Sequence, residues 1–202
     1  MSAARSACAA GSADHNGDRL LQNTAVVLLA AGRSARFGAE KLVVPVNRAP
    51  MVSHALRLGG RFPFKQKIAI VRPDLPEVEE LCRRAGFHAV RNYDASSGMS
   101  QSLDLGIEAI ADAEAALVLL ADMPFVSEHH IRLLLVAFGD PPGIVASARL
   151  GVRMPPAIIG RRLFPKARLL TGDIGARALI ADAPVVEGAA DMLRDIDEPA
   201  QL

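Results

Sequence analysis

Continuous apolar runs alternate with amphipathic stretches along most of the chain. A short run that is apolar at every position is typical of a strand buried on both faces, whereas apolar positions three and four apart indicate a helix with one buried side. A strand is predicted to begin at Val26, and further strands are predicted at 67–71, 88–91, 116–121 and 144–147. Helices are predicted between them at 51–58, 75–85, 98–111 and 127–138, the last one capped by Ser127.

The pattern becomes less regular beyond Val152, where it predicts an extended segment at 154–159, helices near 161–166 and 174–181, and short extended pieces around Val185 and Leu193. Because strands and helices alternate, the expected fold class is α/β, with a Rossmann-like, mainly parallel sheet in three layers. The last third is expected to add a small antiparallel part that closes the site. Residues 1–22 are rich in Ala, Ser and Gly and are expected to form a disordered or vector-derived tail, which leaves 23–202 as a single domain.

Composition and net charge indicate the size of the domain and exclude some kinds of binding partner. The 202 residues are 50% apolar and 22% charged, which suits one domain with a substantial core. The net charge is +1 and no basic stripe is interleaved with aromatic residues, so no nucleic-acid partner is expected. No apolar stretch approaches the roughly 20 residues of a membrane span, and the N-terminal residues are unlike a secretory signal, so a cytoplasmic protein without a membrane partner is expected. Cys82 lies on a predicted helix and is expected to be a buried thiol.

The first predicted strand runs into a loop of small and basic residues, LLAAGRSARFGAEK. Gly32 and Gly38 would let the backbone approach an anion, and Arg33, Arg36 and Lys41 supply positive charge. Five residues lie between the two glycines and the lysine follows later, so the spacing excludes a Walker A loop, and the chain has no G-x-G-x-x-G run. Two interpretations remain open at this point, a triphosphate-binding loop and a solvated basic turn.

A carboxylate follows the apolar run at 117–121. In a parallel sheet the carboxyl ends of the strands meet at one edge, so Asp122 is expected to lie near the glycine-rich loop and near the segment 96–102. Mg²⁺ prefers one or two carboxylates together with phosphate oxygens and water, which makes Asp122 a candidate ligand. The alternative is an Asp that caps the next turn. Asp195 and Asp197 share one face of an extended segment, and either could complete a metal site or simply face solvent.

Five motifs in order resemble those of a known family: LAAGRSARFG-x-x-K at 29–41, SSGMSQSL at 96–103, LLADMP at 119–124, LTGDIGAR at 170–177 and DIDEP at 195–199. Together they resemble the MobA-like nucleotidyltransferases, whose fold is of the nucleotide-diphospho-sugar transferase type. The resemblance covers the chain from about residue 24 onward. It is greatest to the molybdenum cofactor cytidylyltransferases, because of the LAAG form of the first motif together with the late TGD-x-GAR motif. The guanylyltransferase branch more often has a second glycine in place of Ala31, which is a further point of difference.

The resemblance implies a Mg²⁺-dependent transfer of CMP from CTP to the phosphate of Mo-molybdopterin, with release of pyrophosphate. It implies catalytic roles for Arg33, Lys41 and Asp122, metal binding by Asp122 and Asp197, and acceptor binding by Asp173 and Arg177. The implied nucleotide-binding residues are Leu29, Ala30, Ala31, Gly32, Arg33, Ser34, Gly38, Lys41, Ser97, Gly98 and Ser102. A molybdoenzyme that receives the cofactor is a further implied partner. The alternatives are a guanylyltransferase of the same cofactor, a nucleotidyltransferase acting on another phosphorylated metabolite, and an insertion chaperone that only binds the cofactor.

Two departures from the family pattern are visible. Phe37 stands where the family often has Met, and its side chain is expected to pack beneath the loop. Met154-Pro155-Pro156 stands where related enzymes usually have Gly followed by His or Asn before the proline, so a contact near the acceptor is expected to differ.

Local roles are predicted for a few other polar residues. Ser100 and Asp173 are expected to cap the helices that begin beside them. His129 and His130 are expected to face solvent or an interface, because neighbours on a helix point in different directions and cannot easily chelate one ion.

Overall fold

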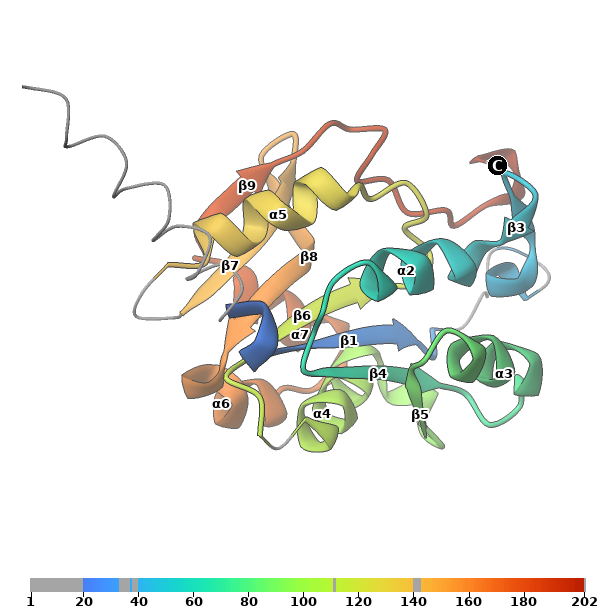
Figure 1. Ribbon diagram of the computed structural model, residues 1–202, viewed down its shortest axis with the longest axis horizontal. Helices are drawn as coiled ribbons and strands as arrows, with labels where there is room; N and C mark the ends of the chain where they lie inside the picture. The colour runs from blue at the N-terminus through green and yellow to red at the C-terminus, as the bar shows by residue number, and fades with distance from the viewer. Residues whose placement is uncertain (1–19, 33–36, 38–39, 111, 140–142, 202) are drawn as a thin grey trace, which may run out of the picture.

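The computed structural model describes residues 20–32, 37, 40–110, 112–139 and 143–201. Its main element is a seven-stranded sheet in the order β5-β4-β1-β6-β8-β7-β9 (Figure 1). Strands of this sheet are β1 (Thr24–Ala30), β4 (Gln66–Val71), β5 (His88–Arg91), β6 (Ala115–Leu120), β7 (Ile144–Arg149), β8 (Val152–Gly160) and β9 (Val185–Glu187). The predicted strands are therefore present except for the extended piece around Leu193, with ends that differ by a few residues.

The four strands β5, β4, β1 and β6 are parallel, with Leu28 of β1 opposite both Ala69 of β4 and Leu119 of β6. Beyond β6 the sheet changes direction. β8 runs antiparallel to both β6 and β7, and β9 pairs with β7 in parallel. The expectation of a mainly parallel α/β sheet with an antiparallel addition in the last third is confirmed.

The helices are α2 (Met51–Gly60), α3 (Pro76–Arg84), α4 (Met99–Ala109), α5 (Glu128–Ala137), α6 (Phe164–Arg168) and α7 (Gly172–Ile180). The described residues also form the 3₁₀ helices η1 (Lys41–Val43), η2 (Ala95–Ser97), η3 (Arg161–Leu163) and η4 (Pro199–Gln201). No helix in the described part of the chain is long and apolar enough to cross a bilayer.

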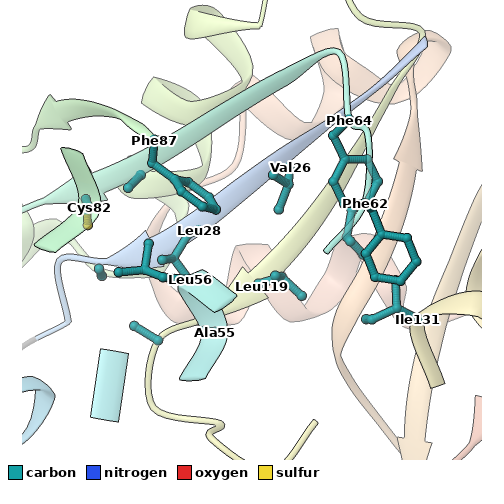
Figure 2. Packing of buried hydrophobic residues seen from close by; sticks show 14 of the residues in the cluster. Val26, Leu28, Ala55, Leu56, Phe62, Phe64, Cys82, Phe87, Leu119 and Ile131 are labelled. Carbon is teal, nitrogen blue, oxygen red and sulfur yellow. The ribbon is translucent and has the colours of Figure 1, made fainter. Parts of the chain in front are cut away.

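Alternate residues of β1 supply the two faces of the core, because successive side chains of a strand point to opposite sides. Val26 and Leu28 pack with α2, α3 and α5, and Figure 2 shows this cluster around Leu56 and Phe87. Val27 faces the other layer, formed by α4, α6 and α7. The strand is buried on both faces, which explains why it is apolar at every position.

Cys82 is fully buried in the first of these layers, as expected. Burial raises the pKa of its thiol to about 12, and the nearby charge of Glu79 acts in the same direction. A thiol with this pKa carries almost no thiolate at neutral pH, so Cys82 is a packing residue.

Two features differ from the expectation. Leu193 is buried but lies in a turn, where its amide donates to the Ala189 carbonyl at 3.1 Å, so no strand forms there. A small hairpin of β2 (Pro45–Val46) and β3 (Ala49–Pro50) was not predicted. Its turn places Asn47 and Arg48 at φ 47° and 68°. Of these two residue types, Asn is the one that is common in this left-handed region.

Candidate functional site

Three parallel strands end at one edge of the sheet, and the segments that follow them build the site. Gly32 follows β1, Arg72 follows β4, and Asp122 follows β6. A fourth segment reaches the same edge from the far end of the chain, because the Ile196 amide donates to the Asp122 carbonyl at 3.0 Å. The edge thus collects residues that are widely separated in sequence, as expected for a parallel α/β sheet.

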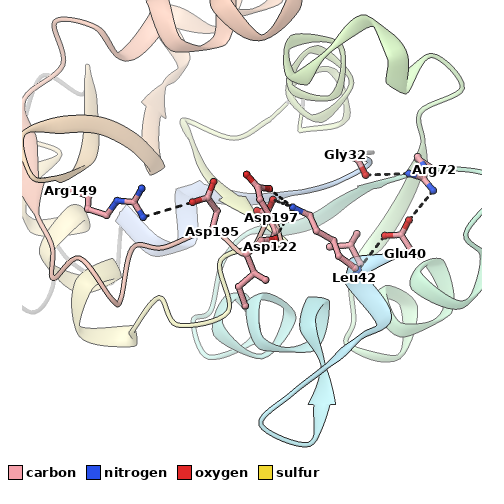
Figure 3. Close-up of polar contacts among 10 residues, drawn as sticks. Gly32, Glu40, Leu42, Arg72, Asp122, Arg149, Asp195 and Asp197 are labelled. Carbon is pink, nitrogen blue, oxygen red and sulfur yellow. Dashed lines mark hydrogen bonds and ion pairs between the residues drawn. The ribbon is translucent and has the colours of Figure 1, made fainter. Parts of the chain in front are cut away.

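Lys41 is the centre of this edge (Figure 3). Its ammonium donates to Asp122 Oδ2 at 2.9 Å, to Asp197 Oδ1 at 2.8 Å and to the Ile196 carbonyl at 3.0 Å. Burial alone would lower the pKa of Lys41, but the charges and hydrogen bonds of the two carboxylates outweigh it and raise the pKa. The side chain is 8% exposed and remains a cation.

Asp122 has one bonded and one unbonded carboxylate oxygen. Oδ2 accepts from Lys41, whereas Oδ1 is buried and has no hydrogen-bond partner among the described residues. Burial raises the pKa of Asp122 and the charge of Asp195 adds to this effect, although Lys41 opposes it. A buried carboxylate oxygen without a donor is costly by itself, so this atom fits a position that a bound cation would satisfy.

The two carboxylates around Lys41 suit a divalent cation that also takes phosphate oxygens. Within the described ranges, no group of three His, Cys, Asp or Glu side chains could hold a metal ion by itself. Asp122 and Asp197 would supply the one or two carboxylates that Mg²⁺ needs when phosphate and water complete its shell. The donor set therefore fits a metal that binds together with a nucleotide.

Asp195 faces a different partner, although it lies on the same segment as Asp197. Its carboxylate lies 3.8 Å from the Arg149 guanidinium, and Arg149 also donates to the Leu193 carbonyl at 3.3 Å. Figure 3 shows Asp195 between Arg149 and the Asp122 carboxylate. Of the two C-terminal aspartates, Asp197 is therefore the one that shares Lys41 with Asp122.

Arg72 and Glu40 support the glycine-rich loop, and the sequence pattern did not single them out. Arg72 donates to the Gly32 carbonyl at 3.3 Å and to Glu40 Oε2 at 2.9 Å. Glu40 Oε1 accepts from the Leu42 amide at 3.2 Å and so caps η1, whose first residue is Lys41. Arg72 directly follows a predicted strand, so the rule that found Asp122 could also have found it.

The loop itself is described only in part. Arg33, Ser34, Arg36 and Gly38 lie outside the described residues. A Cβ built on Gly32 would meet nothing within 4 Å among the described atoms, so no crowding within the fold requires a glycine there.

The residues on either side of that gap are packed. Leu29, Ala30 and Ala31 are buried at the end of β1. Phe37 packs with Val46, Met51 and Ile196; its expected place beneath the loop concerns residues outside those the structure describes.

The serine-rich segment forms the start of α4. Gly98 occupies the N-cap position with φ 90°, a conformation that favours glycine, and no side chain caps the helix. The prediction that Ser100 is the cap is wrong, because its hydroxyl donates to the Gly172 carbonyl instead. Ser102 is buried and accepts from Asn92 Nδ2 at 3.0 Å. Ser97 belongs to η2, and its side chain is not among those described.

The two predicted acceptor residues both lie on α7. Arg177 lines a cavity of about 450 Å³ that also contacts Met154 and Pro155. The N-cap of α7 is Thr171, so the prediction that Asp173 caps this helix is wrong. The side chain of Asp173 lies outside the described residues.

His130 is buried, and the expectation that it faces solvent or an interface is wrong. Its Nε2 lies 2.8 Å from Ser147 Oγ, and that hydroxyl donates to the Pro156 carbonyl at 2.7 Å. Because the one hydroxyl hydrogen is used on Pro156, Nε2 must donate to Ser147. His129 is exposed, as expected.

Known proteins resemble this chain in sequence. A family model described as the MobA-like NTP transferase domain matches residues 26–189. Purine catabolism protein PucB of Bacillus subtilis (strain 168) is 28% identical over 192 residues, which cover 87% of this chain and 92% of PucB.

Solved structures share the fold. The homologue of Rv0371c from Mycobacterium sp. strain JC1 has a TM-score of 0.76 at 25% identity, covering 90% of this chain and 94% of that one. Rv0371c of Mycobacterium tuberculosis H37Rv in complex with manganese has a TM-score of 0.68 at 23% identity, covering 83% of this chain and 88% of that one.

Proposed function

Because this chain belongs to the family of MobA-like NTP transferase domains, and is a nucleotidyltransferase on that ground, we propose that it transfers CMP from CTP to the terminal phosphate of a molybdopterin-type acceptor with release of pyrophosphate. The observation that carries the proposal is the Lys41 ammonium between Asp122 and Asp197 at the carboxyl edge of the sheet. CTP is favoured over GTP by Ala31, which stands where the guanylyltransferase branch more often has glycine.

The attacking group would already be an anion. A phosphate monoester has a second pKa near 6, so at neutral pH the reaction needs no strong general base. The Lys41 ammonium and the carboxylates of Asp122 and Asp197 are the charged groups that lie together at this edge. The protein's task would be to align two anions and to neutralise their charge.

Lys41 supplies the permanent positive charge for this task. Its ammonium is fixed by three acceptors and buried, so little reorganisation is needed when negative charge develops at the α-phosphate. We assign Arg33, Ser34 and Gly38 to the β- and γ-phosphates on the motif alone. Gly32 begins this motif, and a Cβ there would meet nothing within 4 Å among the described atoms.

Asp122 and Asp197 would hold a divalent cation, and Asp122 Oδ1 is the atom with unused capacity. The cation would be Mg²⁺, and it would add positive charge beside the α-phosphate. The manganese bound in the Rv0371c complex supports a divalent ion in this fold.

A screen of nucleotide and acceptor tests the proposal. The full chain is incubated with Mg²⁺, Mo-molybdopterin and either CTP or GTP, and pyrophosphate is measured. We expect release with CTP and little with GTP. Release with GTP alone would overturn the choice of nucleotide, and release only with another phosphorylated metabolite would overturn the acceptor. Tight retention of the cofactor without any pyrophosphate would identify an insertion chaperone for a molybdoenzyme.

A further inference from the structure

Arg72 is the first residue beyond β4, at the same edge of the sheet as the Lys41 ammonium. The residue before it, Val71, is fully buried and pairs with the last residue of β1. The sheet therefore fixes the backbone that carries Arg72. From this position the guanidinium donates to the Gly32 carbonyl at 3.3 Å and to Glu40 Oε2 at 2.9 Å (Figure 3).

The two acceptors stand at opposite ends of the glycine-rich motif. Gly32 is its first glycine, and Glu40 directly precedes its lysine. Two nitrogens of one guanidinium bind them, Nη1 the carbonyl and Nη2 the carboxylate. Because a guanidinium is planar and rigid, its fork limits how far apart the two ends can lie. The side chains of Arg72 and Glu40 are 13% and 16% exposed, so solvent screens this pair less than it screens a surface pair.

Glu40 extends this contact toward Lys41. One of its carboxylate oxygens binds Arg72, and the other accepts from the Leu42 amide at 3.2 Å. This second bond caps η1, the short helix that begins at Lys41. A shift of Glu40 would therefore move the helix whose first residue bonds Asp122 at 2.9 Å.

An ordinary surface ion pair of this protein looks different. Arg84 donates to Glu80 at 2.8 Å, one turn away on α3, and the two side chains are 74% and 48% exposed. That pair joins residues that the helix already holds together. Arg72 joins segments that lie 40 and 32 positions away in the sequence. Its bonds therefore determine tertiary arrangement, and Arg84 offers a matched control.

We propose that Arg72 is a positioning residue for nucleotide binding and transfer. It holds the two ends of the glycine-rich motif at the separation that a triphosphate requires and, through Glu40 and η1, keeps the Lys41 ammonium in place. It acts through these residues and not by a contact of its own with the nucleotide. Ends that are already fixed leave less to be ordered when the nucleotide binds. The inference rests on the proposed function, since it concerns the nucleotide of that same reaction.

Calorimetry on the full chain with Mg²⁺ measures the Kd of CTP, or of GTP if the wild type binds only GTP. We expect Arg72→Gln to weaken binding about tenfold and Arg72→Lys about fivefold, because an ammonium cannot span both acceptors in a fixed geometry. Arg84→Gln, at the exposed pair on α3, should bind like the wild type. Wild-type affinity in Arg72→Lys would show that charge alone suffices and would overturn the proposal.

A role in stability alone is distinguished by the same measurement. It would lower the folded fraction, which appears as reduced stoichiometry, and would leave the Kd unchanged. That result in Arg72→Lys and Glu40→Gln would overturn the proposal. These two milder variants also decide the question if Arg72→Gln does not fold.

A double variant separates positioning from direct contact. Glu40→Gln keeps an oxygen for the Leu42 amide and loses the charge that pairs with Arg72. If Arg72 acts through Glu40, the variant that carries both Arg72→Gln and Glu40→Gln should bind no more than about twofold less tightly than Arg72→Gln alone. Effects that multiply would mean that Arg72 meets the nucleotide directly, and the proposal would be overturned.

Failure of the proposed function is recognised separately. A wild type that binds nucleotide but releases no pyrophosphate with any acceptor would overturn the transfer and leave the binding test of Arg72 valid. Where pyrophosphate is released, Arg72→Gln should also lower kcat about fivefold or more, because Lys41 is displaced. A protein that transfers CMP and binds CTP equally well with and without Arg72 would keep its function and overturn the role of Arg72.

Discussion

Lys41 Nζ lies 2.9 Å from Asp122 Oδ2, although the two residues are 81 positions apart in the sequence. The same ammonium reaches Asp197 at 2.8 Å and so neutralises two carboxylates that would otherwise repel each other. A cation at this edge of the sheet is thus part of the fold itself, before any nucleotide or metal binds.

Lys41→Met removes that cation while keeping most of the side-chain volume. We expect kcat/KM for pyrophosphate release to fall about 100-fold to 1000-fold, because a fixed charge beside the reacting phosphate is lost. The free energy of unfolding should fall by about 1–3 kcal/mol, less than for a fully buried pair, since the Asp197 side chain is 40% exposed. Activity assays and urea titrations check both values. Lys166→Met, at an exposed position of α6, should change neither.

Asp122→Asn is expected to inactivate the protein and yet to stabilise it at neutral pH. A raised pKa means that the folded state binds the carboxyl proton more tightly than the unfolded state. The stability from this group is fully present below the ordinary carboxyl pKa of about 4 and is lost as pH rises through the folded pKa. At pH 7 the ionised, buried carboxylate of Asp122 therefore lowers the free energy of unfolding of the wild type, whereas the uncharged amide of the Asn variant does not.

Urea titrations of the two proteins in EDTA check this prediction. The stability difference should be largest at neutral pH and should shrink toward pH 4. An Asn variant less stable than the wild type at pH 7 would show that the pairing with Lys41 outweighs burial.

Three glycine substitutions separate ligand approach from packing. Gly32→Ala should leave the free energy of unfolding unchanged and weaken CTP binding about tenfold, because its Cβ meets nothing within 4 Å among the described residues. In Gly60→Ala the Cβ also meets nothing within 4 Å, and neither property should suffer. In Gly106→Ala the Cβ would lie 2.4 Å from Val27 Cγ1, so stability should fall by about 1–3 kcal/mol. A Gly32→Ala protein that binds CTP normally would argue against this loop as the phosphate site.

His130 is expected to contribute an acid-sensitive part of the stability. Burial lowers the pKa of its imidazole, and the charge of His129 adds to this. The folded state therefore binds the proton less tightly than the unfolded state, so stability is complete above about pH 6.5 and is lost as pH falls toward the folded pKa. The slope should approach about 1.4 kcal/mol per pH unit at most.

A pair of glutamine variants checks this assignment by urea titration between pH 7.5 and 5. His130→Gln should flatten the profile in this range. His88→Gln, at an exposed position of β5, should retain the slope of the wild type. Identical profiles for the wild type and both variants would mean that other groups control the acid sensitivity.

The central strands could be predicted from the sequence because burial on both faces leaves a signature at every position. β1 and β6 are continuous apolar runs, and the rule that ligands bind beyond their carboxyl ends placed Asp122 beside the loop that ends at Lys41, to which it is bonded. The burial of His130 could also have been predicted. Position 130 lies four residues before Leu134, which is buried, so helical spacing places both on the same face.

Contacts between distant segments were not predictable in the same way. The hydroxyl of Ser100 has a local role available as a helix cap, and only the approach of Gly172 diverts it. The choice of Asp197 over Asp195 as the partner of Lys41 depends on how an irregular segment lies across β6, and no periodic pattern encodes this. Pairing of such residues is decided by tertiary packing.

Ile196 is fully buried among Phe37, Val46 and Met51, and the next residue is Asp197. Burial of Ile196 therefore positions the carboxylate of Asp197. This carboxylate stays beside Lys41 only while Ile196 remains in the apolar cluster. Truncating Ile196 to Ala would release two of the three acceptors around the ammonium together, the Ile196 carbonyl and the Asp197 carboxylate. Such a variant would show reduced catalytic activity, although the altered side chain lies in an apolar cluster and carries no polar group.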